Sequence, residues 1–235
     1  MIYAVVSIGD VVLLDASSIA ETFPGRWWVP PAEMLAEVAP DRAYVKAMAL
    51  ERAGDGGADV WEARPVWIDV EECDAEQATG TIVDSEFEHD GYTEGERLSV
   101  PWEHIFDVVL LDEDGDARFN ESRARFAIGK RVLIGITVLT PDEEAVIERH
   151  AFAGTVASVE PARGIELTLD DRSSYWLPPD TNSLREAAPG EYRLRGTGQT
   201  IVDPDYTATW TITHSGAEAF QLPSAGFAPP DDAAE

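Results

Sequence analysis

The sequence predicts a mainly β protein, built as two small antiparallel β-barrel or sandwich-like domains with one or two short helices. Short runs rich in β-branched and aromatic residues recur at spacings of about 8–12 residues. Several runs alternate apolar and polar residues, as from Ile165 to Asp170, which indicates strands with one buried face. No strand–helix–strand rhythm occurs, so a parallel doubly wound sheet is not expected.

The first half is predicted to begin with a hairpin over 2–6 and 11–14. Pro31 can open a short helix, since proline suits the first helical position, and Pro40 stops it. This is the one helix expected in the first half. Pro65 would put its strand at a sheet edge or a bulge, because proline has no N–H to donate. Further strands are expected at 43–50, 60–70, 79–83 and 98–100.

The second half is predicted to contain a strand over 130–139 and one long bent strand over 146–159. Residues 180–187 are expected to form a short helix. The run 207–213 alternates threonine with alanine, tryptophan and isoleucine, which favours an antiparallel strand. Further strands are expected at 165–169, 174–177 and 192–194.

The domain boundary is predicted in a polar stretch. Residues 1–111 form an N-terminal β domain with one short helix, and 128–222 form a C-terminal β domain. Residues 112–127 are interpreted as the linker, because few contacts cross polar loops of this kind. The Pro- and Ala-rich segment 223–235 is expected to be a disordered tail.

The charge is strongly negative. The chain has 45 Asp and Glu but only 17 Lys and Arg, which gives a net charge of −28. Such a field repels phosphate backbones, which argues against nucleic-acid binding, and it attracts basic proteins and speeds their encounter. General solubility or salt adaptation explains the charge as well, and is slightly favoured over a dedicated cationic partner.

The candidate partner-binding residues are acidic and aromatic. Between Asp69 and Glu96 there are eleven acids and no Lys or Arg. Four of them are spaced two apart, so in an extended chain they would project from one face; as an alternative they belong to a solvated loop. They are Asp84, Glu86, Glu88 and Asp90.

Tryptophans supply the other candidates. Trp27 and Trp28 are adjacent and would point to opposite sides of an extended chain, so one of them is a candidate for an exposed contact. Trp67, Trp176 and Trp210 have strand neighbours and are predicted to lie in the core.

No motif for catalysis, metal or cofactor binding is present. The four histidines are not within metal-ligand spacing of one another, and one cysteine, Cys73, cannot form a local zinc cluster. The run from Asp112 to Asp116 has its glycine at the fourth rather than the sixth position of a calcium loop, and is interpreted as a turn. No cofactor or metal is therefore expected.

The sequence also predicts the localisation of the protein. No apolar run approaches the ~20 residues of a membrane helix. Met1 is not followed by the basic segment, the apolar segment and the small-residue cleavage site of a signal peptide. With a single cysteine, this predicts a cytoplasmic protein without membrane contact. The oligomeric state is left open.

Five short elements of the first half form a recognisable pattern. They are Trp28-Val with the following Pro-Pro and short helix, Trp67-Ile-Asp-Val, Gly80-Thr-Ile, Gly95-Glu-Arg-Leu and His104-Ile-Phe-Asp. Through them, residues about 26–107 resemble a bacterial domain of unknown function found among immunity proteins of polymorphic toxin systems. The segment 52–66 is longer than in that pattern, and the loop 84–94 is more acidic. The resemblance implies a non-enzymatic inhibitor that binds a toxin, and it carries over no catalytic residues.

Together these features predict a non-enzymatic, acidic protein-binding module, of which a toxin-neutralising immunity protein is one form. The partner that the charge favours is a basic protein. One alternative is a small-ligand binder or enzyme with a pocket between the two domains. Another is an accessory domain that makes only transient contacts.

Overall fold

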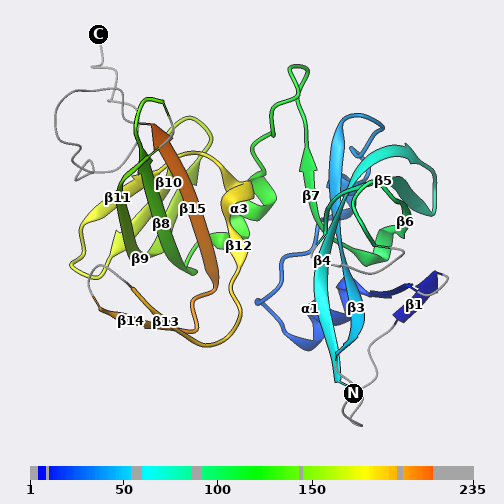
Figure 1. Cartoon of the computed structure of the whole chain (residues 1–235), viewed down its shortest axis with the longest axis horizontal. Helices are drawn as coiled ribbons and strands as arrows, with labels where there is room; N and C mark the ends of the chain where they lie inside the picture. The colour runs from blue at the N-terminus through cyan, green and yellow to red at the C-terminus, as the bar shows by residue number, and fades with distance from the viewer. Residues whose placement is uncertain are drawn as a thin grey trace. The chain divides into compact units, whose positions relative to one another are not determined.

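The computed structural model describes residues 5–8, 11–53, 60–85, 92–142, 145–194 and 198–213. Strands make up 53% of the described residues and helices 13%, which confirms the predicted mainly β fold. The chain divides into two compact units, Met1–Arg118 and Phe119–Glu235, and each is described by itself. Figure 1 shows both units with most of their strands and helices labelled.

The first unit contains a seven-stranded sheet in the order β1-β2-β3-β4-β5-β6, with β7 paired to β3. All of its described strand pairs are antiparallel, and the predicted N-terminal hairpin is present as β1 and β2. The strands are β1 (Val5–Ile8), β2 (Val11–Leu14), β3 (Ala43–Ala53), β4 (Val60–Cys73), β5 (Gln77–Ser85), β6 (Arg97–Pro101) and β7 (Ile105–Leu110).

Alternation along β4 builds the core of the first unit. Val66, Ile68 and Val70 have no exposed surface, whereas the intervening Trp67 and Asp69 are partly exposed. Since successive side chains of a strand point to opposite faces, the two sets lie on opposite sides of the sheet. The buried set packs against β3, β5, β6 and β7 in the main core cluster.

A glycine marks the tightest approach between β4 and β5. A Cβ atom placed on Gly80 would lie 1.7 Å from the backbone oxygen of Asp69. The register of the two strands shifts between Val70 and Glu72, next to this point. Only glycine fits such a close backbone approach, so Gly80 fixes the register.

The first unit has one more helix than predicted. Helix α2 (Ala32–Leu35) follows Pro31 as expected, but α1 (Ala16–Thr22) was not predicted. Asp15 caps α1 by accepting a hydrogen bond from the backbone N–H of Ser18 at 2.7 Å. This capping signal was present in the sequence. A 3-10 helix, η1 (Trp102–His104), precedes β7.

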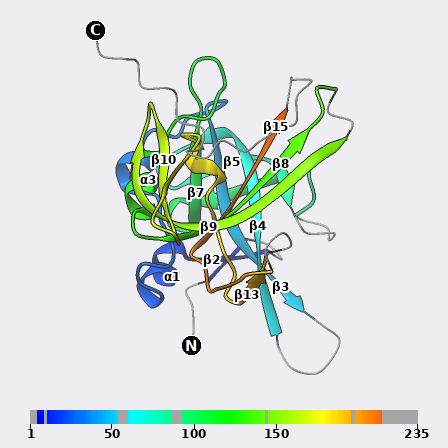
Figure 2. The same cartoon turned by 90° about the vertical axis from the view of Figure 1, so that its left-hand side faces the viewer.

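The second unit contains a six-stranded sheet in the order β11-β10-β9-β8-β15-β12 and a separate hairpin of β13 and β14. The predicted long bent strand is β9, which Figure 2 shows as one curved ribbon. The strands are β8 (Arg131–Leu139), β9 (Val146–Glu160), β10 (Gly164–Leu169), β11 (Ser174–Leu177), β12 (Arg185–Glu186), β13 (Glu191–Arg193), β14 (Thr200–Val202) and β15 (Tyr206–Thr213).

The predicted antiparallel pairing of 207–213 is only partly right. Strand β15 is antiparallel to the short β12, but it runs parallel to β8 from Tyr206 to Thr213. Alternation of buried and exposed residues is the same in both kinds of sheet. The pattern therefore identified the strand and not its direction.

The division between the two units falls within the predicted linker 112–127, whose second half forms helix α3 (Glu121–Ala127). The side chain of Asn120 caps this helix through the N–H of Arg123 at 2.9 Å, and Arg123 itself is 1% exposed. Of the predicted helix 180–187, only the 3-10 helix η2 (Thr181–Ser183) is present, followed by β12. The predicted tail 223–235 lies outside the described residues.

The alternation of β4 and β5 gives a stability prediction. Replacing Ile68 by alanine is expected to cost about 2–5 kcal/mol of unfolding free energy, because the side chain is fully buried. Val83→Ala is the matched control. That side chain is 43% exposed, and its loss should cost no more than about 0.5 kcal/mol. Urea denaturation measures both, and equal losses would contradict the assignment of the two faces.

Candidate functional site

Trp67 lies on the outer face of the first sheet, in the middle of a charged surface. Its cross-strand neighbours are Lys46 on β3 and Asp84 on β5. The prediction that Trp67 belongs to the core is therefore wrong. Val66 and Ile68 occupy the core face of β4, and strand geometry then forces the residue between them outward.

A buried ion pair supports one side of the Trp67 ring. The ammonium group of Lys46 lies 3.3 Å from a carboxylate oxygen of Asp107 on β7, and both side chains are buried. The same ammonium lies 5.5 Å from the centre of the Trp67 ring, within cation–π range. Asp107 also accepts a hydrogen bond from the N–H of Val108 at 2.9 Å.

Carboxylates surround Trp67 along β4 and β5. Asp84 is exposed, and Asp69 is partly exposed on the same face as Trp67. Burial first, and then the negative charges of Asp41 and Glu71, raise the pKa of Asp69 above its ordinary value of 3.8. The free protein thus holds a local excess of negative charge here. Trp67, Lys46, Asp69 and Asp84 are called the Trp67 face below.

One arginine partly neutralises the end of this surface. Arg97 on β6 lies 3.2 Å from Glu71 and 2.8 Å from Glu72, with all three side chains substantially exposed. Exposed pairs of this kind contribute little stability. Glu71 and Glu72 therefore remain accessible to a partner.

The predicted partner-binding residues fall in different surroundings. Asp84 is exposed on β5, as described, and Glu86, Glu88 and Asp90 lie outside the described residues. Trp27 is partly buried and packs edge-on against Phe106, with 6.0 Å between ring centres.

Trp28 requires a correction. Only 3% of its surface is exposed, so in this structure it is an interior residue and not an accessible contact. Adjacent residues point to opposite sides of the chain, as predicted. Here, however, the Trp27 side is covered as well, because Trp27 packs against the cluster that Ile19 of α1 and Phe106 help to form.

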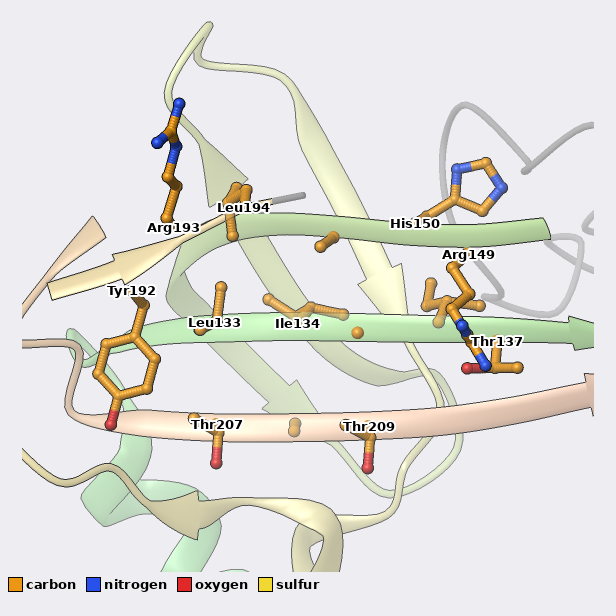
Figure 3. A pocket seen from close by; sticks show the side chains of 14 residues that line it. Leu133, Ile134, Thr137, Arg149, His150, Tyr192, Arg193, Leu194, Thr207 and Thr209 are labelled. Carbon is orange, nitrogen blue, oxygen red and sulfur yellow. The ribbon is translucent and has the colours of Figure 1, made fainter. Parts of the chain in front are cut away.

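A hollow that was not predicted lies within the second unit. It has a volume of about 610 Å³ and is formed over the strands β8, β9 and β15, beside the β13–β14 hairpin. Figure 3 shows Arg149, Thr137 and Thr209 on the three strands, with Tyr192 from the hairpin at one end. The one sequence signal for it was Gly135, a glycine inside an otherwise apolar strand.

Two histidines lie close to oxygen atoms of neighbouring residues. His104 is buried, and its Nδ1 lies 2.8 Å from the backbone oxygen of Leu14. His150 Nε2 lies 3.0 Å from a carboxylate oxygen of Glu148.

Among the described residues, no group of three or more His, Cys, Asp or Glu is arranged to hold a metal ion. No helix in the described part of the chain is long and apolar enough to cross a membrane.

No protein-family model matches the chain, and a search of curated proteins finds no match. The resemblance to immunity proteins therefore rests on the residues quoted for it. Two of its elements, Trp67-Ile-Asp-Val and His104-Ile-Phe-Asp, contribute to the Trp67 face and to the ion pair beneath it.

Breaking the ion pair beneath Trp67 is expected to be costly. Lys46→Met leaves the Asp107 carboxylate buried without this cation, which should destabilise the protein by about 3–5 kcal/mol. The control is Arg118→Met, which removes an exposed ion pair with Glu37 and should cost less than about 1 kcal/mol. Urea denaturation of both variants tests this, and similar losses would contradict a structural role for Lys46.

Asp69 gives a prediction about pH. Since its pKa is raised in the folded state, ionisation of Asp69 costs stability at every pH above that raised value. Below its ordinary pKa of 3.8, the carboxyl is protonated in both states and the cost disappears. We therefore expect Asp69→Asn to be more stable than the parent at about pH 7, with the difference vanishing by about pH 3.

Denaturation of the two proteins at several pH values measures this difference. Glu113→Gln, at an exposed turn residue, removes one negative charge elsewhere and serves as the control. A gain that persists unchanged at low pH would show that charge on Asp69 is not its cause.

Proposed function

We propose that this chain is a non-enzymatic protein-binding module and that the Trp67 face binds a basic protein. The observation that carries the proposal is the placement of a partly exposed tryptophan between outward-facing carboxylates. Trp67 has Asp84 directly opposite it on β5, and Asp69 two residues further along β4. Aromatic anchors of this kind dominate the binding energy of many protein interfaces.

The chemistry of the face fits an arginine or lysine of the partner. The ring of Trp67 already attracts the ammonium group of Lys46. An arriving guanidinium can stack on an indole ring and pair with a neighbouring carboxylate at the same time. Asp84, which is exposed, is the carboxylate best placed for that pairing.

The electrostatics favour the same kind of partner. A positive charge beside Asp69 would relieve the repulsion that raises its pKa. At larger distances, the net charge of −28 would steer a basic protein toward the chain and increase its association rate. Both contributions weaken as salt increases.

The resemblance to immunity proteins suggests which basic protein this is. We infer a toxin, neutralised in the cytoplasm by occlusion rather than by chemistry. Nuclease toxins bind phosphate backbones through basic clefts, and an acidic surface would occupy such a cleft. This part of the proposal rests on the quoted residues and on charge.

Capture from a lysate of the source organism tests the proposal. Tagged parent protein should retain one basic protein at about 0.1 M salt and lose it at about 1 M, where the screening length falls from about 10 Å to about 3 Å. With that protein purified, Trp67→Ala and Asp84→Lys should each weaken binding by at least about 30-fold, as expected for residues at the centre of an interface.

The matched control is Glu113→Lys, which makes the same charge reversal at an exposed turn residue. It should change affinity by no more than about threefold, since it acts only through the long-range field. No stoichiometric partner at either salt concentration, or equal effects of all three substitutions, would overturn the proposed face. Circular dichroism confirms that the variants remain folded.

A further inference from the structure

The hollow in the second unit results from how three strands align their outward-facing residues. The registers place Gly135 of β8 between Ala151 of β9 and Thr209 of β15. The middle of this face thus carries almost no side-chain volume. A Cβ atom on Gly135 would lie 3.3 Å from the Thr209 methyl group, so a side chain there would require Thr209 to shift by a few tenths of an ångström.

The two ends of the hollow differ in chemistry. At one end, Tyr192 and Leu194 pack with Ala153 and Leu133 and form an apolar wall. The Tyr192 hydroxyl donates to the backbone oxygen of Ala188 at 2.8 Å, which helps to hold its ring in place.

At the other end, the register pairs Arg149 with Thr137. Figure 3 shows the Arg149 side chain extending from β9 toward Thr137. The Arg149 side chain forms no ion pair or hydrogen bond with any residue that the structure describes.

The hollow is also an exception to the charge of the chain. None of its 14 lining residues is Asp or Glu, although these make up 45 of the 235 residues. Two other basic residues line it, but neither points inward. Arg193 extends away from the strands in Figure 3, and His150, adjacent to Arg149, projects to the opposite face and contacts Glu148. Arg149 is therefore the charged group that a ligand in the hollow would meet.

We propose that this hollow binds a small organic monocarboxylate with a flat apolar body. The carboxylate would pair with the Arg149 guanidinium, and the body would lie over Gly135 and Ala151 toward the ring of Tyr192. The volume of about 610 Å³ is within the range of about 300–1,000 Å³ that small-molecule sites span. The charge complementarity comes from the one guanidinium that points into the hollow, in a lining without carboxylates. This site is independent of the Trp67 face.

A titration with 4-phenylbutyrate, followed by amide NMR of the full chain, tests the proposal. Saturable shifts are expected at Gly135, Ala151 and Thr209. The uncharged 4-phenylbutan-1-ol has the same apolar body and should bind at least about tenfold more weakly, as expected for loss of a charge-assisted hydrogen bond.

Substitutions separate the charge from the shape of the site. Arg149→Gln should weaken phenylbutyrate binding at least about tenfold while leaving the alcohol unchanged. Gly135→Val should abolish binding of both, because the side chain fills the floor. Should that variant fail to fold, Ala151→Leu tests the same floor from β9. The matched control is Arg185→Gln, at an exposed arginine of β12 that does not line the hollow, and it should bind as the parent does.

Several results would overturn the proposal. Equal affinity for the acid and the alcohol would show an unselective apolar surface. Shifts that do not saturate, or that map to other residues, would show that the hollow is not the site. Line broadening at Gly135 and Ala151 that depends on protein concentration, without ligand, would identify a second copy of the chain as the occupant instead.

Discussion

The alternation of inward and outward side chains along β4 and β8 is the constraint on which both proposed surfaces depend. In β4 it commits Val66 and Ile68 to the core, and this leaves Trp67 no position except the outer face. In β8 it commits Ile134 and Ile136 to the core, which leaves Gly135 outside. A shift of one residue in either register would exchange the two sets and remove the surface.

Buried polar contacts join further elements in each unit. In the first unit, Lys46 and Asp107 pair across β3 and β7, where displacement would leave two charges uncompensated. In the second unit, the buried Arg123 of α3 donates to the backbone oxygen of Leu184 and lies 3.9 Å from Glu186. This attaches the helix to the segment that enters β12. In both units a buried cation joins elements that are distant in sequence.

Much of the strand content followed from local pattern, because alternation and turn residues are read over only a few positions. The hairpin, the long β9 and the alternation of β4 were all predictable in this way. The parallel pairing of β15 with β8 was not, since direction depends on the path between strands and not on the residues within them. The cap of α1 by Asp15 was visible, but the helix is short and its apolar face small.

The candidate surfaces were harder to predict, because exposure depends on residues from several strands. The β-rich surroundings of Trp67 suggested a core residue, and only the registers of β3 and β5 show that charged side chains flank it. For Trp28 the error was the opposite one: it was a candidate for an exposed contact, but tertiary packing buries it. Its neighbours in the sequence did not determine its exposure. Asp84 lies on β5, one residue beyond the predicted strand 79–83, and it is exposed, as is usual for an acid without a buried partner.

Net charge determines less about recognition than local arrangement does. A field of −28 charges acts on any basic partner at long range, but beyond about 8–10 Å in physiological salt it is largely screened. Within that distance, the nearest side chains determine which charged groups are attracted. The Trp67 face places carboxylates beside an aromatic ring, whereas the hollow over Gly135 has Arg149 and no carboxylate in its lining. The same acidic chain can therefore offer a cation-binding surface on one sheet and an anion-binding surface on the other.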